Sequence, residues 1–370
     1  MKGSHSQRLL LLSVGYGQGH HSAAAAVAEH YAALGWNTRV EDVCELSQPG
    51  LFRLTQRFYD FCVRRAPWLW GVTYSLTDTA DWGALVRRLP FRHSLACLRE
   101  LLGEYEPDLV ICTYPLFAYM LDELQRCGGG VPPYAVLVTD ALEISRPWMR
   151  SRCPLVLLPD AVSAAMVKER YALSEDAAVA AGFPVRSSFA PCAERVKPGW
   201  ECLRMVYGAY RQTRGVEADI SALLEAFPQL SLMVIAGRRA NLLRRRFSAY
   251  CSAGRLEVLE STTRMHELLA GSHFYVGKAG AATVFECYAV NVPVLVNFTL
   301  PGQERGNLDL LLMDGAGCHI ESTEHLVASV RGLLQNDADG WQKMCDAMRR
   351  AGRSQGALRV YQTIKDKLGV

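Results

Sequence analysis

The chain has 370 residues, 50% of them hydrophobic, and a formal net charge of +3. This length suits two domains, each with its own core, and a charge so close to neutral excludes a general nucleic-acid binder. The 12 cysteines form no C-x-x-C pair and no close His/Cys cluster of the kind that holds structural zinc. We therefore expect free thiols in a reducing compartment and no bound metal ion.

The apolar run that begins the chain is too short for a targeting segment. It covers Leu9 to Leu12 and is broken at Gly15, well before the length of a signal peptide. Nowhere do about 18 apolar residues follow one another, so we expect no transmembrane helix. These observations predict a cytoplasmic protein whose membrane contact is peripheral.

Short apolar strands and helices alternate along both halves of the chain. The first predicted helix, Ser22–Ala33, carries Ala23, Val27 and Tyr31 on one face. The predicted strands are Arg8–Val14, Asp108–Thr113, Tyr134–Asp140 and Pro154–Asp160, then Leu203–Gly208, Leu230–Gly237, Arg255–Glu260, His273–Lys278 and Val292–Phe298. Continuous apolar strands between helices predict parallel sheets with both faces covered.

The stretch Gly182–Glu201 is rich in proline and charge and has no periodicity, which predicts a domain boundary. We expect an α/β chain of two doubly wound, Rossmann-like domains at 1–185 and 186–350, with a final helix at 350–370 that packs back on the first. In such sheets ligands bind beyond the carboxyl ends of the strands. We therefore expect the site in a deep cleft between the two domains.

The turn "GYGQGH" joins the first strand to the first helix. Gly15, Gly17 and Gly19 allow a tight backbone that a ligand can approach. The spacing is G-x-G-x-G-H rather than the G-x-G-x-x-G of dinucleotide sites. His20 therefore stands where the helix start meets the expected cleft, as a candidate catalytic residue. The alternative is a histidine that only caps or packs the helix.

A second strand–helix corner, "VGKAGAATVFE", suits a diphosphate and a ribose. Lys278, Gly280 and Thr283 open a helix whose N-terminus can hold phosphate oxygens. Glu286 lies one turn further, where a carboxylate can accept two ribose hydroxyls. The alternative is an ordinary corner with a solvent-exposed glutamate.

The loop "LPGQERGN" follows the next strand. Gln303, Glu304 and Asn307 are polar groups behind a Pro-Gly turn and could read sugar hydroxyls. The alternative is a polar loop that caps the following helix.

The stretch from Phe52 to Asp78 mixes aromatic residues with arginines. Arg64, Arg65, Trp68 and Trp70 are typical of a segment that contacts an anionic membrane or a lipid acceptor. The alternative is a buried aromatic cluster with arginines that reach out to solvent.

Together these motifs resemble the monogalactosyldiacylglycerol synthase and processive diacylglycerol glucosyltransferase family, within the family 28-like glycosyltransferases. The resemblance rests on "YGQGHHSAAAAV", "APWLWGVTYSLTD", "AGFPVRSSF", "TRMHELLAGSHFYVGKAGAATVFECYAVNVPVLV" and "LPGQERGNLDLLLMDGAG", which stand in the family's order over nearly the whole chain. It implies the GT-B fold, with an acceptor and membrane-binding domain first and a UDP-sugar-binding domain second.

The resemblance also implies an activity. The chain would be an inverting enzyme that moves galactose or glucose from a UDP-sugar to the sn-3 hydroxyl of 1,2-diacylglycerol. The product would be a β-monohexosyldiacylglycerol, made at the cytoplasmic face of an anionic membrane without a cofactor or nucleic acid.

The resemblance assigns a role to each matching residue. His20 would be the general base, Glu286 would bind the uridine ribose, and Gln303 with Glu304 would hold the hexose, assisted by Asn307. Lys278, Gly280 and Thr283 would frame the diphosphate.

Two departures from the family pattern stand out. Ser145 and Arg146 occupy the place where the family's acceptor-side histidine is expected, although Thr139, Asp140 and Trp148 are kept. The glycine-rich loop after the first strand of the second half retains only Gly208 and Gly215. Arg211 and Arg214 are candidates to replace its backbone amides at the diphosphate.

Two other functions stay open at this point. One is a UDP-N-acetylglucosaminyltransferase that acts on a different lipid acceptor. The other is a non-catalytic UDP-sugar- or lipid-binding relative, which the missing histidine favours and the joint presence of His20, Glu286 and Glu304 opposes.

Overall fold

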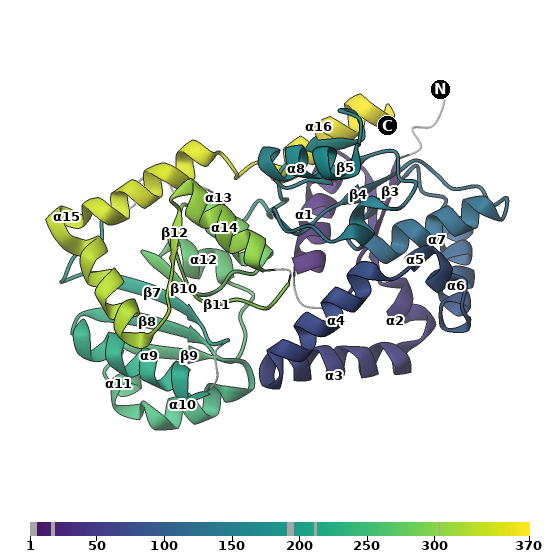
Figure 1. Cartoon of the computed structure of the whole chain (residues 1–370). Helices are drawn as coiled ribbons and strands as arrows, with labels where there is room; N and C mark the ends of the chain where they lie inside the picture. Colours follow the sequence, from purple (N-terminus) through teal and green to yellow (C-terminus); the bar gives the residue numbers. More distant parts are fainter. Residues whose placement is uncertain (1–5, 16–18, 191–195, 211–212, 303) are drawn as a thin grey trace. The chain divides into compact units, whose positions relative to one another are not determined.

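A computed structural model describes residues 6–15, 19–190, 196–210, 213–302 and 304–370. The chain divides into two compact units, coloured by sequence in Figure 1. The first unit comprises Met1–Ser187, Pro301–Gly306 and Ser354–Val370, and the second comprises Ser188–Leu300 and Asn307–Arg353. The segment Pro301–Gly306 thus belongs to the first unit although the chain on both sides of it belongs to the second.

The first unit is built on a parallel six-stranded sheet with the order β2-β1-β3-β4-β5-β6. Its strands are β1 (Arg8–Leu12), β2 (Asn37–Glu41), β3 (Leu109–Cys112), β4 (Tyr134–Leu137), β5 (Val156–Leu158) and β6 (Ala178–Ala180). Four of them, β1, β3, β4 and β5, are almost fully buried, as expected for strands with helices on both faces.

The helices of the first unit lie on both sides of this sheet (Figure 1). They are α1 (Gly19–Ala33), α2 (Val43–Ser47), α3 (Pro49–Arg65), α4 (Pro67–Thr79), α5 (Trp82–Val86), α6 (Leu89–Tyr105), α7 (Pro115–Arg126), the 3-10 turn η1 (Arg146–Met149), α8 (Ala161–Tyr171) and α16 (Gly356–Leu368). Proline opens α3 and α4 at their first position, where its missing N–H costs nothing.

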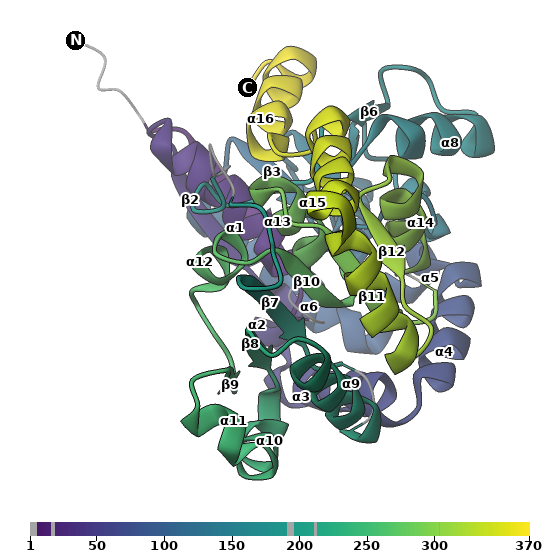
Figure 2. The ribbon, with the colours of Figure 1, turned by 90° about the vertical axis from the view of Figure 1, so that its left-hand side faces the viewer.

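The second unit repeats the architecture with the strand order β12-β11-β10-β7-β8-β9, again parallel. Its strands are β7 (Leu203–Gly208), β8 (Leu230–Ile235), β9 (Leu256–Leu259), β10 (Phe274–Lys278), β11 (Val294–Phe298) and β12 (Gly317–His319). Figure 2 shows helices α10 and α11 beside the edge strand β9. The predicted doubly wound α/β architecture is therefore confirmed in both units.

The helices of the second unit end with a long one. They are α9 (Thr213–Ala226), η2 (Gly237–Arg239), α10 (Ala240–Arg246), α11 (Ser248–Ser252), α12 (Met265–Ala270), α13 (Ala281–Val290), α14 (Arg305–Asp314) and α15 (Thr323–Ala351), which is kinked at residues 335–338.

One buried carboxylate ties the second sheet to its helices. Asp219 on α9 accepts hydrogen bonds from the Tyr207 hydroxyl at 2.7 Å, the Asn297 amide at 3.1 Å and the Thr323 hydroxyl at 2.6 Å. These donors stand on β7, on β11 and at the start of α15. Three donors satisfy a charge that would otherwise be costly to bury, and so fix these elements together.

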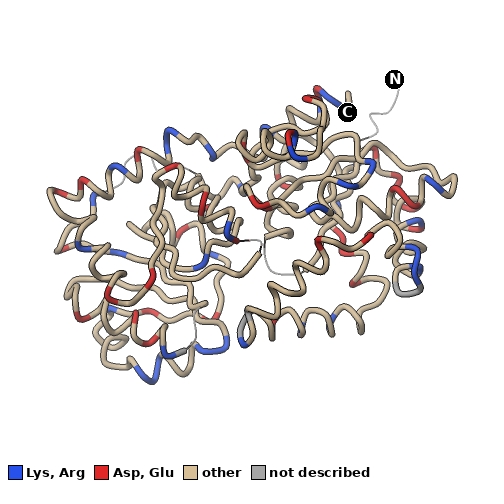
Figure 3. The backbone as a smooth tube through the Cα atoms, viewed as in Figure 1, with Lys and Arg blue, Asp and Glu red and all other residues tan. Residues whose placement is uncertain are grey.

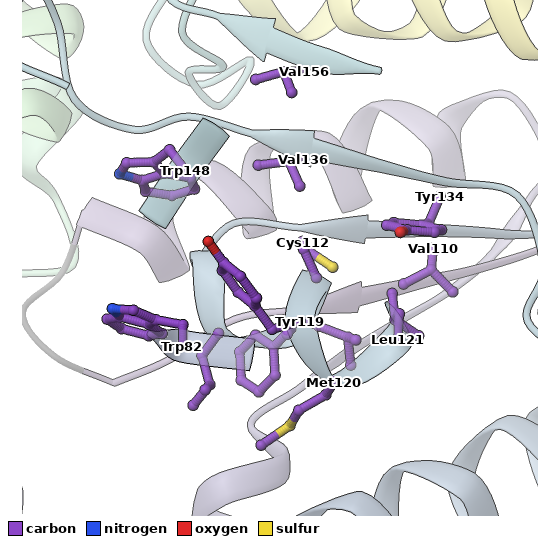
Figure 4. Close-up of a cluster of buried hydrophobic side chains, with 14 of the residues drawn as sticks. Trp82, Val110, Cys112, Tyr119, Met120, Leu121, Tyr134, Val136, Trp148 and Val156 are labelled. Atoms are coloured by element: carbon purple, nitrogen blue, oxygen red, sulfur yellow. The ribbon is translucent and has the colours of Figure 1, made fainter. Parts of the chain in front are cut away.

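The core of the first unit combines aliphatic strand residues with aromatic side chains from α5, α7 and η1 (Figure 4). Trp82 and Tyr119 lie with their ring centroids 6.1 Å apart. The Tyr119 hydroxyl points toward the Trp148 segment and donates to the Pro147 carbonyl at 2.9 Å. A buried Tyr with a bonded hydroxyl adds area to the core without an unsatisfied polar atom.

The last helix, α16, packs on α1 within the first unit. Tyr361 places its ring 5.3 Å from the ring of Tyr31. At the start of α16, a Cβ on Gly356 would lie 1.9 Å from the Phe183 carbonyl oxygen. Only glycine therefore allows the helix start to reach this backbone.

Gly356→Ala is expected to lower the free energy of unfolding by about 1–3 kcal/mol, because the Phe183 backbone cannot move aside. Urea denaturation measures the loss. Gly103→Ala in α6 is the control, since nothing lies within 4 Å of its Cβ position and alanine favours a helix. Equal stability of the two variants would contradict this packing.

Candidate active site

The turn before α1 is held by side chains from two neighbouring elements. The Gly15 N–H donates to Asp42 Oδ2 at 3.0 Å, and its carbonyl accepts from Gln56 Nε2 at 3.1 Å. A Cβ on Gly15 would lie 2.8 Å from that amide nitrogen, so a larger residue here would displace the Gln56 side chain from the turn. Gly19 opens α1 with free space around its Cβ position. Gly17 lies outside the described residues.

His20, in the first turn of α1, faces residues that follow β3 and β4. Its Nδ1 lies 2.8 Å from Thr139 Oγ1, and its ring centroid is 5.2 Å from that of Tyr114 and 6.2 Å from that of Trp148. Burial lowers the pKa of His20 to about 4, against a smaller opposite effect of the Thr113 backbone. The imidazole is therefore neutral at pH 7, the state in which it can accept a proton.

A second titratable group directly follows Thr139, the residue that contacts His20. This group is Asp140, and its Oδ2 accepts from Trp148 Nε1 at 3.3 Å. Burial raises the pKa of Asp140 to about 7, although the Trp148 bond opposes this, and the nearby Glu304 carboxylate adds to the rise. Glu304 is itself only 2% exposed. Two carboxylates therefore share one partly dehydrated region beside Trp148.

Asp140→Asn is expected to stabilise the protein, by about 2 kcal/mol at pH 8 and little at pH 4. The folded pKa of Asp140 lies above its unfolded value of about 4, so ionisation costs stability as the pH rises from 4 to 7. His20 acts oppositely, because its folded pKa lies below its unfolded value of about 6.5 and stability grows from pH 4 to 6.5.

Urea unfolding of the Asp140→Asn variant at pH 4, 6 and 8 measures this dependence. The gain should appear between pH 4 and 7 and stay constant above it. The exposed Asp366→Asn in α16 is the control. A gain of the same size at all three pH values would refute the assignment.

Glycines fix the segment Pro301–Gly306, which carries Glu304, to the rest of the first unit. A Cβ on Gly306 would lie 1.9 Å from the Ala141 carbonyl oxygen and 2.6 Å from the Glu143 nitrogen. Gly302 has a φ of +97°, and its Cβ position lies 2.6 Å from the Tyr74 ring. The segment thus lies directly on helix α4 and on the loop after β4. Gln303 lies outside the described residues.

Arg146 stands where the family's histidine is expected, and it pairs with α4. The backbone N–H of Arg146 donates to Asp78 Oδ1 at 2.6 Å, and the side-chain Nε lies 3.7 Å from Asp78 Oδ2. The departure therefore replaces an imidazole with an ion pair between η1 and α4.

In the second unit, the corner between β10 and α13 gathers the predicted donor residues. Gly280 is the N-cap of α13 and gives no side-chain cap, so the helix begins with backbone N–H groups that a phosphate can use. Lys278 ends β10, Thr283 lies in the first turn, and Glu286 is buried one turn later. The corner therefore offers a cation and a helix N-terminus at the carboxyl end of β10, a central strand of the sheet.

The buried Asn307 supports this corner from behind. Its Nδ2 donates to the Ala279 carbonyl at 3.0 Å. The structure thus gives this side chain a bond to the backbone between Lys278 and Gly280.

Two tyrosines that the sequence analysis did not select lie near the carboxyl ends of β7 and β10. Lys278 Nζ lies 5.2 Å from the centroid of the Tyr210 ring, which is a cation–π distance. A Cβ on Gly208 would lie 2.7 Å from the Tyr275 hydroxyl and 2.8 Å from Tyr210 Cε2. The tyrosines thus occupy space beside the shortened glycine loop. Arg211 lies outside the described residues.

Helices α3 and α4 expose apolar side chains, and their tubes are mostly tan in Figure 3. Trp68 is 70% exposed and Arg65 is exposed, whereas Trp70 packs against Tyr59 with ring centroids 4.8 Å apart. The side chain of Arg64 lies outside the described residues. Two aromatic residues of the predicted segment, Phe58 and Phe61 on α3, are exposed as well. The sequence analysis missed the aliphatic part of this apolar face, which is Leu51 and Leu54 on α3 and Val72 and Leu76 on α4. Their spacing of three and four residues was the available signal.

Within the described parts of the chain, no three His, Cys, Asp or Glu side chains come close enough to hold a metal ion. No helix among the described residues is long and apolar enough to cross a bilayer.

Two doubly wound parallel sheets define the GT-B fold. The solved structure of Acinetobacter baumannii MurG matches with a TM-score of 0.61 at 15% identity and covers 97% of this chain and 99% of its own. A complex of Staphylococcus aureus MnaA with UDP matches with a TM-score of 0.62 at 13% identity, over 98% of this chain and 97% of its own.

The sequence matches two families, monogalactosyldiacylglycerol (MGDG) synthase over residues 20–185 and the glycosyltransferase family 28 C-terminal domain over residues 213–356. The two matches together span most of the chain, which is therefore similar to monogalactosyldiacylglycerol synthases and processive diacylglycerol glucosyltransferases.

Two relatives of this chain differ in the sugar that their names imply. The processive diacylglycerol β-glucosyltransferase of Bacillus subtilis is 24% identical over 345 residues, which cover 90% of this chain and 88% of the relative. A probable chloroplastic monogalactosyldiacylglycerol synthase of Glycine max is 24% identical. The alignment covers 99% of this chain and 72% of the relative.

Proposed function

We propose that this enzyme transfers galactose or glucose from a UDP-sugar to the sn-3 hydroxyl of 1,2-diacylglycerol with inversion at the anomeric carbon. The observation that carries the proposal is His20, a neutral, half-buried imidazole at the start of the first helix, in a chain whose residues 20–185 match the monogalactosyldiacylglycerol synthase family. Relatives named for transfer to diacylglycerol support the acceptor.

The proposed chemistry is a single displacement. The acceptor hydroxyl attacks the anomeric carbon while its proton passes to the His20 imidazole, and the bond from that carbon to the diphosphate oxygen breaks. Charge that develops on the leaving UDP would be stabilised by Lys278 and the free N–H groups at the start of α13. An α-linked donor then gives a β-glycolipid.

The Thr139 contact supports His20 in this role. A hydroxyl 2.8 Å from Nδ1 fixes the ring in one orientation, which leaves Nε2 for the acceptor when Nδ1 carries the proton. The Thr113 backbone favours the protonated ring. It would therefore stabilise the imidazolium that forms as the acceptor loses its proton.

We propose that Glu304 and Gln303 hold the hexose and that Glu286 holds the ribose, as the family pattern implies. Buried carboxylates suit such contacts, because water has little access to them. A sugar hydroxyl can then donate the hydrogen bond that water would otherwise supply. Asp140, close to Glu304, lies on the same side of the first unit and can contribute to hydroxyl binding there.

The apolar face of α3 and α4 is proposed to dock on the membrane, with Arg65 and Arg64 directed to anionic headgroups. A helix whose apolar side chains are exposed at three- and four-residue spacing is typical of a segment that lies in the bilayer interface. The proposed location is therefore peripheral, on the cytoplasmic face of the membrane. There the enzyme can reach diacylglycerol while this lipid stays in the bilayer.

The triple variant Leu54→Ser, Phe58→Ser, Trp68→Ser is expected to weaken binding to vesicles that contain anionic lipid by about tenfold or more, since each removed side chain contributes of order 1 kcal/mol of apolar burial. Vesicle flotation measures the bound fraction. The control changes the exposed Leu242 and Met313 of the second unit to Ser. Undiminished flotation of the triple variant would rule out this docking face.

A parallel transfer assay tests the reaction itself. Purified protein is incubated with vesicles of diacylglycerol and anionic lipid and with UDP-galactose, UDP-glucose or UDP-N-acetylglucosamine, and the glycolipid is identified by mass. One hexosyl product supports the proposal and names the sugar. Product from UDP-N-acetylglucosamine alone favours the alternative activity, an N-acetylglucosaminyltransferase. UDP binding without any product favours a non-catalytic relative.

A further inference from the structure

A cavity of about 450 Å³ lies in the first unit, outside the group of residues around His20. It is formed by the end of α4, by α5, by α7 and by the turn at residues 150–152. Four arginines line it, namely Arg87, Arg126, Arg150 and Arg152. This volume falls within the range of about 300–1,000 Å³ typical of small-molecule sites.

The acidic residues of the cavity are all engaged within the protein. Glu123 binds Arg126 through two hydrogen bonds of 2.8 and 2.6 Å and lies 3.8 Å from Arg87. Asp122 accepts from the Tyr134 hydroxyl at 2.5 Å and from the backbone N–H of Arg152 at 2.8 Å.

The third acidic residue, Asp81, caps α5 by accepting from the Ala84 N–H at 2.9 Å. Among the described residues, neither the Arg150 nor the Arg152 guanidinium forms an ion pair with an acidic side chain. The donors of these two arginines are therefore available to a ligand.

The charge of the lining sets the charge of the ligand. Four arginines and three acidic residues leave a net charge of +1. Burial of a ligand with a single negative charge would neutralise the cavity. Guanidinium groups bind planar pairs of oxygens through two parallel hydrogen bonds, which suits a phosphate or a carboxylate.

The floor of the cavity is aromatic. Trp82 and Tyr119 line it, and both are almost completely buried (Figure 4). A ligand with one anionic group and an uncharged carbon body would place the anion on the arginines and the body on these rings. This combination favours a phosphodiester with organic groups on both sides over a bare ion.

We propose that this cavity is a binding site for a phosphodiester, either the headgroup of an anionic phospholipid or a soluble glycerophosphodiester. The lipid source has support from the exposed apolar face, because Leu76 on α4 lies one turn before the lining residues Thr79 and Ala80. The site does not depend on the transfer reaction and can be tested without it.

Isothermal titration of the full chain with glycerophosphoglycerol tests the soluble source. Flotation with phosphatidylcholine vesicles, with and without one-fifth phosphatidylglycerol, tests the lipid source. Both are repeated with the double variant Arg150→Gln, Arg152→Gln. The matched control is Arg245→Gln, Arg246→Gln, which removes two exposed arginines from α10 of the second unit.

At least tenfold weaker binding of one probe by Arg150→Gln, Arg152→Gln, with the control unchanged, is the expected result. Loss confined to glycerophosphoglycerol assigns a soluble ligand, and loss confined to the anionic vesicles assigns a lipid headgroup. Binding that both double variants reduce equally would show a general charge effect and overturn the proposal. It would also be overturned if neither probe depended on these arginines, or if acetate competed as well as the phosphodiester.

Discussion

Replacing His20 with alanine is expected to lower kcat for glycosyl transfer by about 10²–10⁴-fold, because the acceptor hydroxyl then has no positioned base. The side chain lies half-buried beside Thr139 and Tyr114 and is neutral at pH 7, so its loss removes the proposed proton acceptor without removing a charge. Steady-state transfer from the preferred UDP-sugar measures the effect.

Two further measurements separate this loss from misfolding. The His20→Ala variant should bind UDP as tightly as the wild type, since the proposed UDP-binding residues Lys278 and Glu286 lie in the other unit. His20→Gln keeps a polar side chain of similar size and should be equally inactive. Turnover within about threefold of the wild type in either variant would reject His20 as the base.

Replacing Gly306 with alanine is expected to reduce transfer by about 10²-fold, because the added Cβ would lie 1.9 Å from the Ala141 carbonyl oxygen. The segment that carries Glu304 would have to move off the loop after β4. A displacement of about 1 Å in a substrate-positioning group is enough for a loss of this size. The ratio kcat/KM for the UDP-sugar is the quantity to compare.

Gly332→Ala in α15 serves as the matched control, because nothing lies within 4 Å of its Cβ position. The melting temperature and UDP binding of both variants show whether each is folded. A folded Gly306→Ala variant with wild-type kcat/KM would mean that the position of Glu304 does not matter for transfer.

Much of the fold could be predicted from hydrophobic runs. The strands β1, β3, β4 and β5 are continuous apolar segments after Arg8, because helices cover both sides of the sheet and every other side chain of these strands is buried. The edge strand β2 was not predicted. Its residues are exposed or half-buried and mostly polar, so no apolar run marks it. The three-residue strands β6 and β12 are too short to carry a pattern of their own.

The candidate site was predictable where a local motif marks it. The glycines before His20 and the corner at Gly280 both combine a strand end, a turn and a helix start, which a sequence displays directly. The raised pKa of Asp140 arises from burial and from the Glu304 carboxylate, which comes from a distant part of the chain, while the Trp148 bond opposes the rise. Tyr210 likewise meets Lys278 only because β7 and β10 are neighbours in the sheet. Neither contact has a signal in the sequence.

The anomeric configuration of the glycolipid tests the central claim most directly. The product formed from the preferred α-linked UDP-hexose and diacylglycerol is isolated, and the coupling constant of its anomeric proton is measured by NMR. A single displacement assisted by His20 predicts a β-linkage, and the His20→Ala variant should form no more than a trace of it. An α-linked product, or a β-linked product made equally fast by His20→Ala, would contradict the proposed mechanism.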